Sequence, residues 1–329
     1  MSGEGPRLKH EGDTGLLSRA ATFAPPPGTL LERPGAPGYY LDFSMKAPSP
    51  SWPPPWLQSG APVMCVTVAQ FGLGSFERYV KGEGEEFLSS ARRAAEWLIA
   101  NRIEGGRLDG GLPHRFGMPH TYEIHPPWLS AMAQGQAASL LARLGVELGE
   151  DELGTAASRA LSPLRVPVSE GGVLAELGGR PFFEEYPTDP GSFVLNGAIF
   201  TIWGLRDIAR CLDDGEVAAE LETATEALAA NLDRWDIGYW SRYDLFPHPL
   251  PNVSSEAYHH LHITQLGVMA ALSPDPSFAD VARRFSGYAE DRGDRVRALA
   301  AKVAFRLAVP RNRLLARRMP WRHRGRNSR

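Results

Sequence analysis

The stretch "EEFLSSARRAAEWLIANRI", residues 85–103, has the clearest periodicity in this chain of 329 residues and decides its fold class. Apolar side chains recur in it at spacings of three and four, and Gly105 and Gly106 follow it closely. This spacing places the apolar side chains on one face of an α-helix, and the two glycines end the helix. The stretch therefore predicts an amphipathic helix whose buried face is made by Phe87, Leu88, Ala91, Ala95, Leu98 and Ile99.

Similar helical blocks follow, separated by turn residues. They cover about 128–145, 151–162, 192–212, 216–234, 258–272, 277–288 and 293–309. No internal sequence repeat relates them, but a regular succession of helices and polar loops predicts an all-α domain of stacked helical hairpins. Minor β-pieces are expected over 171–183, because turn glycines there alternate with apolar residues that have no helical period.

Composition divides the chain into three parts. Residues 1–62 form a proline- and glycine-rich arm in which regular helices are excluded, because proline lacks the backbone N–H and fixes φ. Residues 63–310 form the helical domain, and residues 311–329 form a basic tail. We expect the aromatic side chains of the arm to pack on the helical domain, namely Tyr39, Tyr40, Phe43, Trp52 and Trp56.

The charge of the chain is unevenly distributed. The net charge is −3, yet the segment after Pro310 holds eight arginines and no acidic residue, so the rest of the chain is acidic. Two interpretations stay open for this tail: a solvated terminus, or a contact with a polyanion such as nucleic acid or an anionic membrane surface.

Targeting signals and cysteine spacing add further expectations. The chain has no run of about 18 apolar residues and no apolar core in its first twenty residues, so we expect no membrane span and a cytoplasmic location. Cys65 and Cys211 lie far apart without a CxxC spacing, which predicts two free buried thiols instead of a disulfide or a structural zinc site.

The segment "FFEEYPTDPGSFVLNGAIF", residues 182–200, places two carboxylates and a tyrosine before a proline-rich turn. Adjacent side chains of an extended segment point in opposite directions, so we expect only one of Glu184 and Glu185 to face a substrate. Like charges side by side raise one pKa, which suits a general acid or base. The alternative is a solvated acidic pair at a helix N-terminus. Ser192 is expected to cap a helix that begins near Phe193.

A second polar cluster lies in "WSRYDLFPHPLPNVSSEAYHHLHITQL", residues 240–266. His259 and His262 share one helical face, but no carboxylate completes a zinc motif, so hydrogen-bonded histidines are favoured over a metal site. In residues 128–145, small residues permit close helix contact, and Gln134 is a polar exception that either supports loops or faces a cleft.

Four segments together resemble the C-terminal domain of the D-glucuronyl C5-epimerases, which convert glucuronate to iduronate in heparosan-type polysaccharides. The segments occur in the order typical of that family, and "AQFGLGSFERYV", residues 69–80, resembles the family's preceding segment. The resemblance covers about residues 62–272 and is carried by "WLSAMAQGQAASLL", "EEYPTDPGSFVLNGAIF", "YDL" and "PNVSSEAYHHLHITQL".

This resemblance implies a fold and a set of site residues. The fold is an incomplete (α/α) toroid, and the catalytic groups would be Glu185, Tyr186, Tyr243 and Tyr258. Neither a cofactor nor a metal is expected, the partner would be a uronate-containing oligo- or polysaccharide, and a homodimer is left open. The side chains expected to bind substrate are Arg242, His248, His259, His262, Asn196 and Gln134.

The chain departs from the family pattern at charged positions in two segments, and the "ARWD" expected before Tyr258 is Ser254, Ser255, Glu256 and Ala257 here. The family commonly has "YDLRH", whereas this chain has "YDLFPH", with Phe246 and Pro247 in place of the arginine and histidine. Arg242 and His248 are the nearby candidates to replace them. An α-proton can leave a uronate only if the charge that develops on its carboxylate is stabilised, so a cation is expected in the site.

These residues predict a uronate C5-epimerase that removes the C5 proton on one face of the sugar and returns one on the other. Tyr186, polarised by Glu185, and Tyr258 are the expected opposed acid and base, with Tyr243 orienting or stabilising the intermediate. A toroid-type polysaccharide lyase and a non-catalytic glycan-binding protein stay open as alternatives, and a glycoside hydrolase, which needs two opposed carboxylates, ranks below them.

Overall fold

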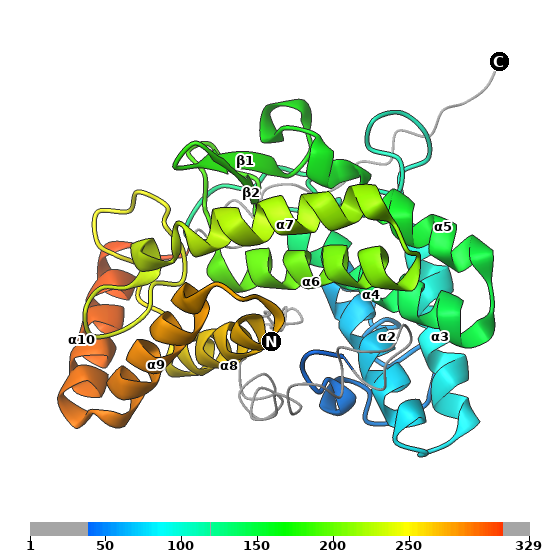
Figure 1. The fold of residues 1–329 in the computed structure, drawn as a ribbon, viewed down its shortest axis with the longest axis horizontal. Helices are drawn as coiled ribbons and strands as arrows, with labels where there is room; N and C mark the ends of the chain where they lie inside the picture. The colour runs from blue at the N-terminus through cyan, green and yellow to red at the C-terminus, as the bar shows by residue number, and fades with distance from the viewer. Residues whose placement is uncertain (1–38, 119, 312–329) are drawn as a thin grey trace, which may run out of the picture.

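The computed structural model describes residues 39–118 and 120–311 (Figure 1). The 3₁₀ segments are η1 (Ser44–Lys46), η2 (Ser162–Arg165), η3 (Val168–Glu170) and η4 (Leu232–Trp235). Two strands, β1 (Leu174–Leu177) and β2 (Arg180–Phe183), pair antiparallel. The helices are α2 (Cys65–Val80), α3 (Glu85–Ala100), α4 (Ala131–Leu148), α5 (Asp151–Ala160), α6 (Leu195–Cys211), α7 (Gly215–Ala229), α8 (Glu256–Leu272), α9 (Pro276–Glu290) and α10 (Arg292–Ala308).

The predicted all-α class is confirmed in the described part of the chain. Each expected helical block corresponds to a helix, and the expected β-pieces form the hairpin of β1 and β2. None of the helices in residues 39–118 and 120–311 is long and apolar enough to cross a membrane.

Consecutive helices form four hairpins. α2 packs on α3, α4 on α5, α6 on α7, and α8 on α9, and α6 and α7 lie side by side in Figure 1. The first helices of the hairpins also pack on one another in the order α2, α4, α6 and α8, so they make an inner layer that the second helices cover. The apolar character of α4 and α6 follows from this position, since most of their side chains are buried.

Small residues let the inner helices α4 and α6 approach closely, as the sequence predicted. A Cβ added at Gly204 would lie 2.5 Å from the Cα of Gly135, and one added at Gly135 would lie 2.7 Å from the Cα of Thr201. Real Cβ atoms do not approach other atoms this closely, so the crossing requires glycine at both positions.

The described part of the arm packs on the inner layer. Tyr40 donates its hydroxyl proton to Asp207 of α6 across 2.8 Å, and Arg143 of α4 donates to both oxygens of the same carboxylate at 2.9 Å. The Arg143 guanidinium also lies 5.3 Å from the centre of the Tyr40 ring. The prediction that the arm's aromatic residues pack on the helices is confirmed, since all belong to or contact the core: Tyr39, Tyr40, Phe43, Trp52 and Trp56.

Two predictions are corrected. Ser192 does not cap α6, because Phe193 has a φ of 49° and the helix begins only at Leu195. The Ser192 hydroxyl instead contacts Glu184 and the Tyr186 carbonyl. Both cysteines are free, as predicted, but Cys65 is buried whereas Cys211 is only half-buried. The predicted tail contact falls on residues that, beyond Arg311, lie outside the described residues.

Candidate functional site

The three tyrosines implied by the family resemblance come from separate segments and meet in one buried aromatic cluster. Tyr186 follows β2, Tyr243 lies between η4 and α8, and Tyr258 is in the first turn of α8. The ring centres of Tyr243 and Tyr258 are 4.8 Å apart, and Tyr186 hydrogen-bonds to Tyr243. The structure therefore places Tyr243 in contact with both of the other two tyrosines.

The cluster forms at the shared N-terminal end of the inner helices. It includes Met64, the N-cap of α2, Trp128, which lies just before α4, Val194, the N-cap of α6, and Tyr258 of α8. The N-terminus of a helix carries partial positive charge and free backbone N–H groups. This end of the inner layer consequently favours an anionic group such as the carboxylate of a uronate.

The two adjacent glutamates point to different surroundings, as expected for an extended segment. Glu184 accepts hydrogen bonds from the backbone N–H of Phe193 at 3.0 and 3.2 Å and from the Ser192 hydroxyl. Burial raises the pKa of Glu184 to about 7, although these hydrogen bonds oppose the shift. Glu184 thus supports the loop before α6.

Glu185 lies against the first turn of α6. Its Oε2 accepts from Asn196 Nδ2 at 3.4 Å, and a Cβ added at Gly197 would lie 2.5 Å from the same oxygen. The Glu185 carboxylate acts electrostatically on Tyr243 and Tyr122. Of the two glutamates, Glu185 is therefore the one that acts on Tyr243, and glycine at 197 makes room for it.

The hydroxyls of Tyr243 and Tyr122 favour the protonated form. Burial raises the pKa of Tyr243 well above its usual value, and the charge of Glu185 raises it further. Tyr122 is affected in the same way by burial and by Asp244, Glu185 and Glu184. A phenol that keeps its proton is a hydrogen-bond donor, so these groups are suited to stabilise negative charge on a ligand.

Two aromatic residues of the cluster, His120 and Tyr122, were not predicted from the sequence. His120 lies with its ring centre 4.8 Å from that of Tyr186 and 4.0 Å from that of Tyr122. Tyr122 in turn lies 5.8 Å from Tyr186 and 5.1 Å from Phe246. The concentration of histidine and aromatic residues in "HTYEIHPPW", residues 120–128, was the available signal.

The last described helix, α10, is joined to the segment that carries Tyr243. Lys302 Nζ donates to Asn252 Oδ1 at 3.0 Å and to the carbonyl of Val253. Asn252 donates from Nδ2 to Asp244 Oδ2 at 2.6 Å, and its carbonyl accepts from the backbone N–H of Tyr243 at 2.7 Å. These contacts form a continuous path from α10 to the tyrosine cluster.

Arg306 brings a cation from α10 towards the same cluster. Its Nη1 is buried without a hydrogen-bond partner among the described residues. Burial lowers the pKa of Arg306, and so does Arg311, whereas Asp244 and Tyr243 oppose the shift. A buried guanidinium nitrogen with no partner, within electrostatic reach of Tyr243, is able to bind an anion.

Arg242 and His248, the predicted replacements for the missing family residues, take different positions. Arg242 Nε donates to the carbonyl of Asp244 at 3.1 Å. The His248 ring stacks 6.1 Å from Tyr122 and lies 5.1 Å from Phe305 of α10. Burial and the charges of Arg242 and Arg306 lower the pKa of His248 to about 4, so its imidazole is neutral at pH 7.

His259 and His262 support the backbone next to the cluster. His259 Nε2 donates to the Phe285 carbonyl at 2.9 Å, which leaves Nδ1 to accept from the backbone N–H of Ser241 at 3.2 Å. His262 Nδ1 lies 3.0 Å from Ser241 Oγ. Burial lowers the pKa of His259 to about 4 and that of His262 to about 3, so both are neutral.

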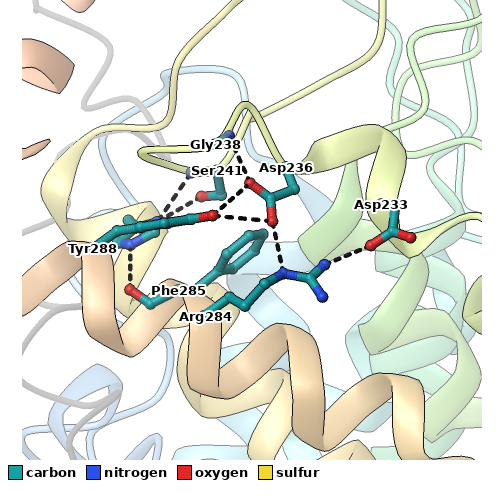
Figure 2. A network of polar contacts seen from close by, with 8 residues as sticks. Asp233, Asp236, Gly238, Ser241, Arg284, Phe285 and Tyr288 are labelled. Carbon is teal, nitrogen blue, oxygen red and sulfur yellow. Dashed lines mark hydrogen bonds and ion pairs between the residues drawn. The ribbon is translucent and has the colours of Figure 1, made fainter.

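A second polar network, centred on Asp236, lies close to Ser241 (Figure 2). In it, Arg284 Nε donates to Asp236 Oδ2 at 2.9 Å, and the Tyr288 hydroxyl donates to Asp236 Oδ1 at 3.2 Å. The network fixes the segment that runs from η4 to Ser241, and Arg242 and Tyr243 follow it directly. His259 and His262 thereby hold the backbone of the site and do not join its aromatic cluster.

The remaining predicted site residues, Gln134 and Asn196, have different hydrogen-bond partners. The Gln134 side chain accepts from the backbone N–H of Leu112 at 2.8 Å and donates to the carbonyls of Gly110 and Ala160. It therefore supports loops, which was one of the two expected roles. Asn196 contacts Glu185, and its carbonyl accepts from Gln265 at 3.1 Å.

A cavity of about 430 Å³ lies away from this cluster, between the C-terminal parts of α6 and α8 and the outer helix α7. Ile202, Arg206, Glu222 and Met269 are among its lining residues. Across residues 39–118 and 120–311, no group of three or more His, Cys, Asp or Glu side chains is arranged to hold a metal ion.

The family model described as the D-glucuronyl C5-epimerase C-terminus matches residues 109–287, more than half of the chain, and the chain belongs to this family. The match includes β2, α6 and most of α8 and α9, and thus all three tyrosines, but it ends before α10.

Two relatives show how far the similarity reaches. The D-glucuronyl C5-epimerase of Caenorhabditis elegans is 32% identical over 212 residues, which cover 60% of this chain and 34% of that protein. An uncharacterized protein of Methanocaldococcus jannaschii is 24% identical over 149 residues, 44% of this chain and 47% of that one. The matched region spans about a third of the first relative and less than half of the second.

Proposed function

We propose that the chain is a uronate C5-epimerase, an isomerase that converts a D-glucuronate residue of a glycan into L-iduronate. The observation that carries the proposal is the meeting of Glu185, Tyr186, Tyr243 and Tyr258 at the N-terminal end of the inner helices. Membership of the epimerase family supports the same chemistry. We also infer that the inner and outer helices form an incomplete (α/α) toroid, since the hairpins alternate as such a fold requires.

Inversion at C5 requires two groups on opposite faces of the sugar ring. One tyrosine, in its phenolate form, takes the C5 proton and becomes a neutral hydroxyl, while the electron pair of the C–H bond moves into the carboxylate to form an enediolate. The hydroxyl of the opposite tyrosine then donates its proton to C5, which restores the carboxylate and inverts the centre. We assign these two roles to Tyr186 and Tyr258, because Tyr243 contacts both of them.

Charge on the enediolate needs stabilisation from the surrounding groups. Tyr243 keeps its proton because burial raises its pKa, so it is suited to donate a hydrogen bond to an enediolate oxygen. Nη1 of Arg306, which is buried and has no hydrogen-bond partner among the described residues, is suited to neutralise the carboxylate, and the N-terminal ends of the inner helices add to its effect. We infer that Glu185 polarises Tyr186 as a hydrogen-bond acceptor that draws the phenolic proton away from the Tyr186 oxygen.

Two other functions share parts of this site. A polysaccharide lyase would begin with the same proton removal and then expel the substituent at C4, whereas a glycan-binding protein would hold the sugar without exchange. The family of the chain favours epimerisation over both. The heparosan-type substrate, the cytoplasmic location and the homodimer stay predictions.

Incubation with a heparosan-type oligosaccharide in deuterated water separates these functions. An epimerase incorporates deuterium at C5 and produces iduronate signals in NMR spectra, without the ultraviolet absorbance of an unsaturated uronate. Rising absorbance would identify a lyase, and binding without deuterium incorporation would identify a glycan-binding protein.

Tyr258→Phe is the matching variant, because it removes one proposed acid–base hydroxyl and keeps the ring. We expect it to abolish exchange while the melting temperature is preserved. Tyr79→Phe on α2 is the control, since the Tyr79 hydroxyl bonds Glu147 on the exposed surface. Exchange by Tyr258→Phe at the wild-type rate would remove Tyr258 from the mechanism.

A further inference from the structure

His120 lies against the tyrosines of the candidate site. Its ring centre is 4.0 Å from that of Tyr122, 4.8 Å from that of Tyr186 and 6.4 Å from that of Tyr243. These phenols face it from three segments, namely its own loop, the residues after β2 and the residues before α8. The His120 side chain is itself buried, so a charge on its ring acts on these neighbours with little screening by water.

The proposed reaction needs one tyrosine in the phenolate form. An ordinary tyrosine is ionised to only about one part in a thousand at pH 7, and burial makes the phenolate rarer still. Burial and then the charge of Glu185 raise the pKa of Tyr243, and Tyr122 is affected by burial and by nearby carboxylates in the same direction. A phenolate among these carboxylates therefore requires a positive charge beside it.

The cations of the site are directed to the segment that carries Tyr243. Lys302 donates to Asn252 and to a backbone carbonyl, and Arg242 also donates to a backbone carbonyl. Arg306 acts electrostatically on Tyr243. These contacts leave the charge needed at Tyr186 to another group.

Four other histidines are neutral at pH 7. Burial lowers the pKa to about 4 in His114, His248 and His259 and to about 3 in His262. The His114 ring stacks 4.1 Å from Trp128, and its Nε2 accepts from a backbone N–H. His120 is distinguished from these histidines by its ring contact with Tyr186.

We propose that His120 is a positioning residue that shares a proton with Tyr186, so that Tyr186 becomes a phenolate while His120 becomes an imidazolium. The inference rests on the proposed function, because it assigns the source of the phenolate in that reaction. The imidazolium also offsets the repulsion between the phenolate and the carboxylate of Glu185.

The protons balance over one turnover. The phenolic proton of Tyr186 moves to a ring nitrogen of His120, and the phenolate then takes the C5 proton and becomes neutral. Tyr258 donates its hydroxyl proton to the opposite face of C5 and is left as a phenolate. Tyr243, which contacts both acid–base tyrosines, passes its hydroxyl proton to Tyr258 and receives the proton held by His120, which restores the starting state.

NMR of the free full-length protein tests the shared proton without a substrate. The carbon-13 signal of the tyrosine Cζ reports ionisation of the phenol, and Tyr186→Phe identifies the Tyr186 signal by its loss. We expect this signal to titrate at least about one pH unit lower in the wild type than in His120→Gln, because glutamine accepts no proton.

Deuterium exchange at C5 provides a second readout. His120→Gln should lower kcat/KM for exchange by about 10²-fold at pH 7. The loss should shrink by about tenfold for each pH unit above 7, because hydroxide then ionises Tyr186 in place of His120. A purely structural role of His120 would give a loss of kcat/KM that is the same at every pH.

Two further variants serve as comparisons. His120→Phe keeps an aromatic ring against Tyr122 and Tyr186 but has no nitrogen that can take a proton, so it should lose exchange as His120→Gln does. His125→Gln is the matched control, since His125 is an exposed histidine of the same loop, and it should exchange at the wild-type rate. Circular dichroism of all variants checks that the fold is retained.

Two results would overturn the inference. One is a Tyr186 signal that titrates at the same pH in the wild type and in His120→Gln. The other is exchange by His120→Phe at the wild-type rate at pH 7, which would reduce His120 to a packing role. If the wild type exchanges no deuterium while its Tyr186 signal still depends on His120, the proposed function fails and the shared proton stands.

Discussion

At the scale of single residues, the position of the family's arginine and the nearby arginine of this chain lie on different elements. The position at which the family commonly has an arginine holds Phe246, and this aromatic side chain packs on Tyr122 instead. Arg306 of α10, sixty positions further along the chain, supplies a cation within reach of Tyr243. In the proposed epimerase, Arg306 would provide the positive charge that the family's arginine commonly provides.

Replacement of Arg306 tests this assignment. We expect Arg306→Met to lower kcat/KM for deuterium exchange by about 10²-fold or more, because a preorganised charge is removed from the transition state. The melting temperature should stay the same or rise, since Nη1 has no hydrogen-bond partner among the described residues that could be lost. Arg306→Lys should recover part of the activity.

Arg297→Met serves as the control, because Arg297 lies on the same helix over the ring of Tyr239, in a cluster separate from the tyrosines. Equal losses of kcat/KM in both variants would show that any change of an arginine on α10 lowers exchange, without a specific role for Arg306. Wild-type exchange in Arg306→Met would exclude Arg306 from the site.

The buried carboxyl of Glu184 predicts a pH dependence of stability. Burial raises its pKa from 4.5 to about 7, so the folded state binds its proton more tightly than the unfolded state does. The resulting stabilisation is full below about pH 4.5 and is lost as the pH rises through 7. The wild type should therefore lose about 3 kcal/mol of unfolding free energy relative to Glu184→Gln across this range.

Urea unfolding at a series of pH values measures this difference. Glu123→Gln, which changes an exposed carboxylate, should follow the wild-type curve. If the curves of wild type and Glu184→Gln run parallel from pH 4 to 8, the Glu184 pKa is not raised in the folded protein.

Local motifs carried the residue-level predictions from the sequence. The motifs around Tyr186, Tyr243 and Tyr258 were long enough to identify these residues, and the structure brings them together, although their catalytic roles stay predictions. His120, Tyr122 and Arg306 were missed because they reach the cluster only through tertiary packing. No local pattern records such a contact.

At the scale of elements, helical periodicity located the hairpins well. The predicted block 151–162 corresponds to Asp151–Ala160, and 258–272 corresponds to Glu256–Leu272. The predicted start of α6 was wrong. Serine is a common N-cap residue, but the backbone of Phe193 is left-handed, so the helix begins only at Leu195. That conformation depends on the hydrogen bonds from Phe193 to Glu184, which lies nine residues away.

The crossing of α4 and α6 yields an element-level prediction. Gly204→Ala should lower the unfolding free energy by more than about 2 kcal/mol, because the added methyl group meets the backbone of Gly135. Helix propensity alone would predict that alanine raises the unfolding free energy. Chemical denaturation provides the measurement.

Gly267→Ala in α8 is the matched control for this substitution. A Cβ at Gly267 meets no atom within 4 Å, so alanine should stabilise the protein by about 0.5–1 kcal/mol. If both alanines stabilised the protein, α4 and α6 would be able to move apart without a loss of unfolding free energy.

At the scale of the whole molecule, one buried ion pair joins parts that are far apart in the chain. Asp207 of α6 receives hydrogen bonds from Arg143 of α4 and from Tyr40 of the arm. Asp207→Ala leaves the Arg143 charge buried without this partner, and we expect it to cost about 3–5 kcal/mol of stability.

Asp280→Ala is the comparison for Asp207→Ala. Its carboxylate pairs with Arg283 on the exposed surface of α9, and such pairs contribute about 0.5 kcal/mol or less. Thermal unfolding of the two variants separates a buried anchor from a surface pair. Similar melting temperatures would contradict the role of Asp207 in holding the arm.

The attachment of α10 also affects how the protein matures on the ribosome. The chain is made from its N-terminus, so the three tyrosines leave the exit tunnel before Lys302 and Arg306 do. Until α10 docks on Asn252 and Val253, a nascent chain can hold the aromatic cluster but has no Arg306 beside it. In the proposed epimerase, the site would therefore be complete only after α10 has been made and has docked on Asn252 and Val253.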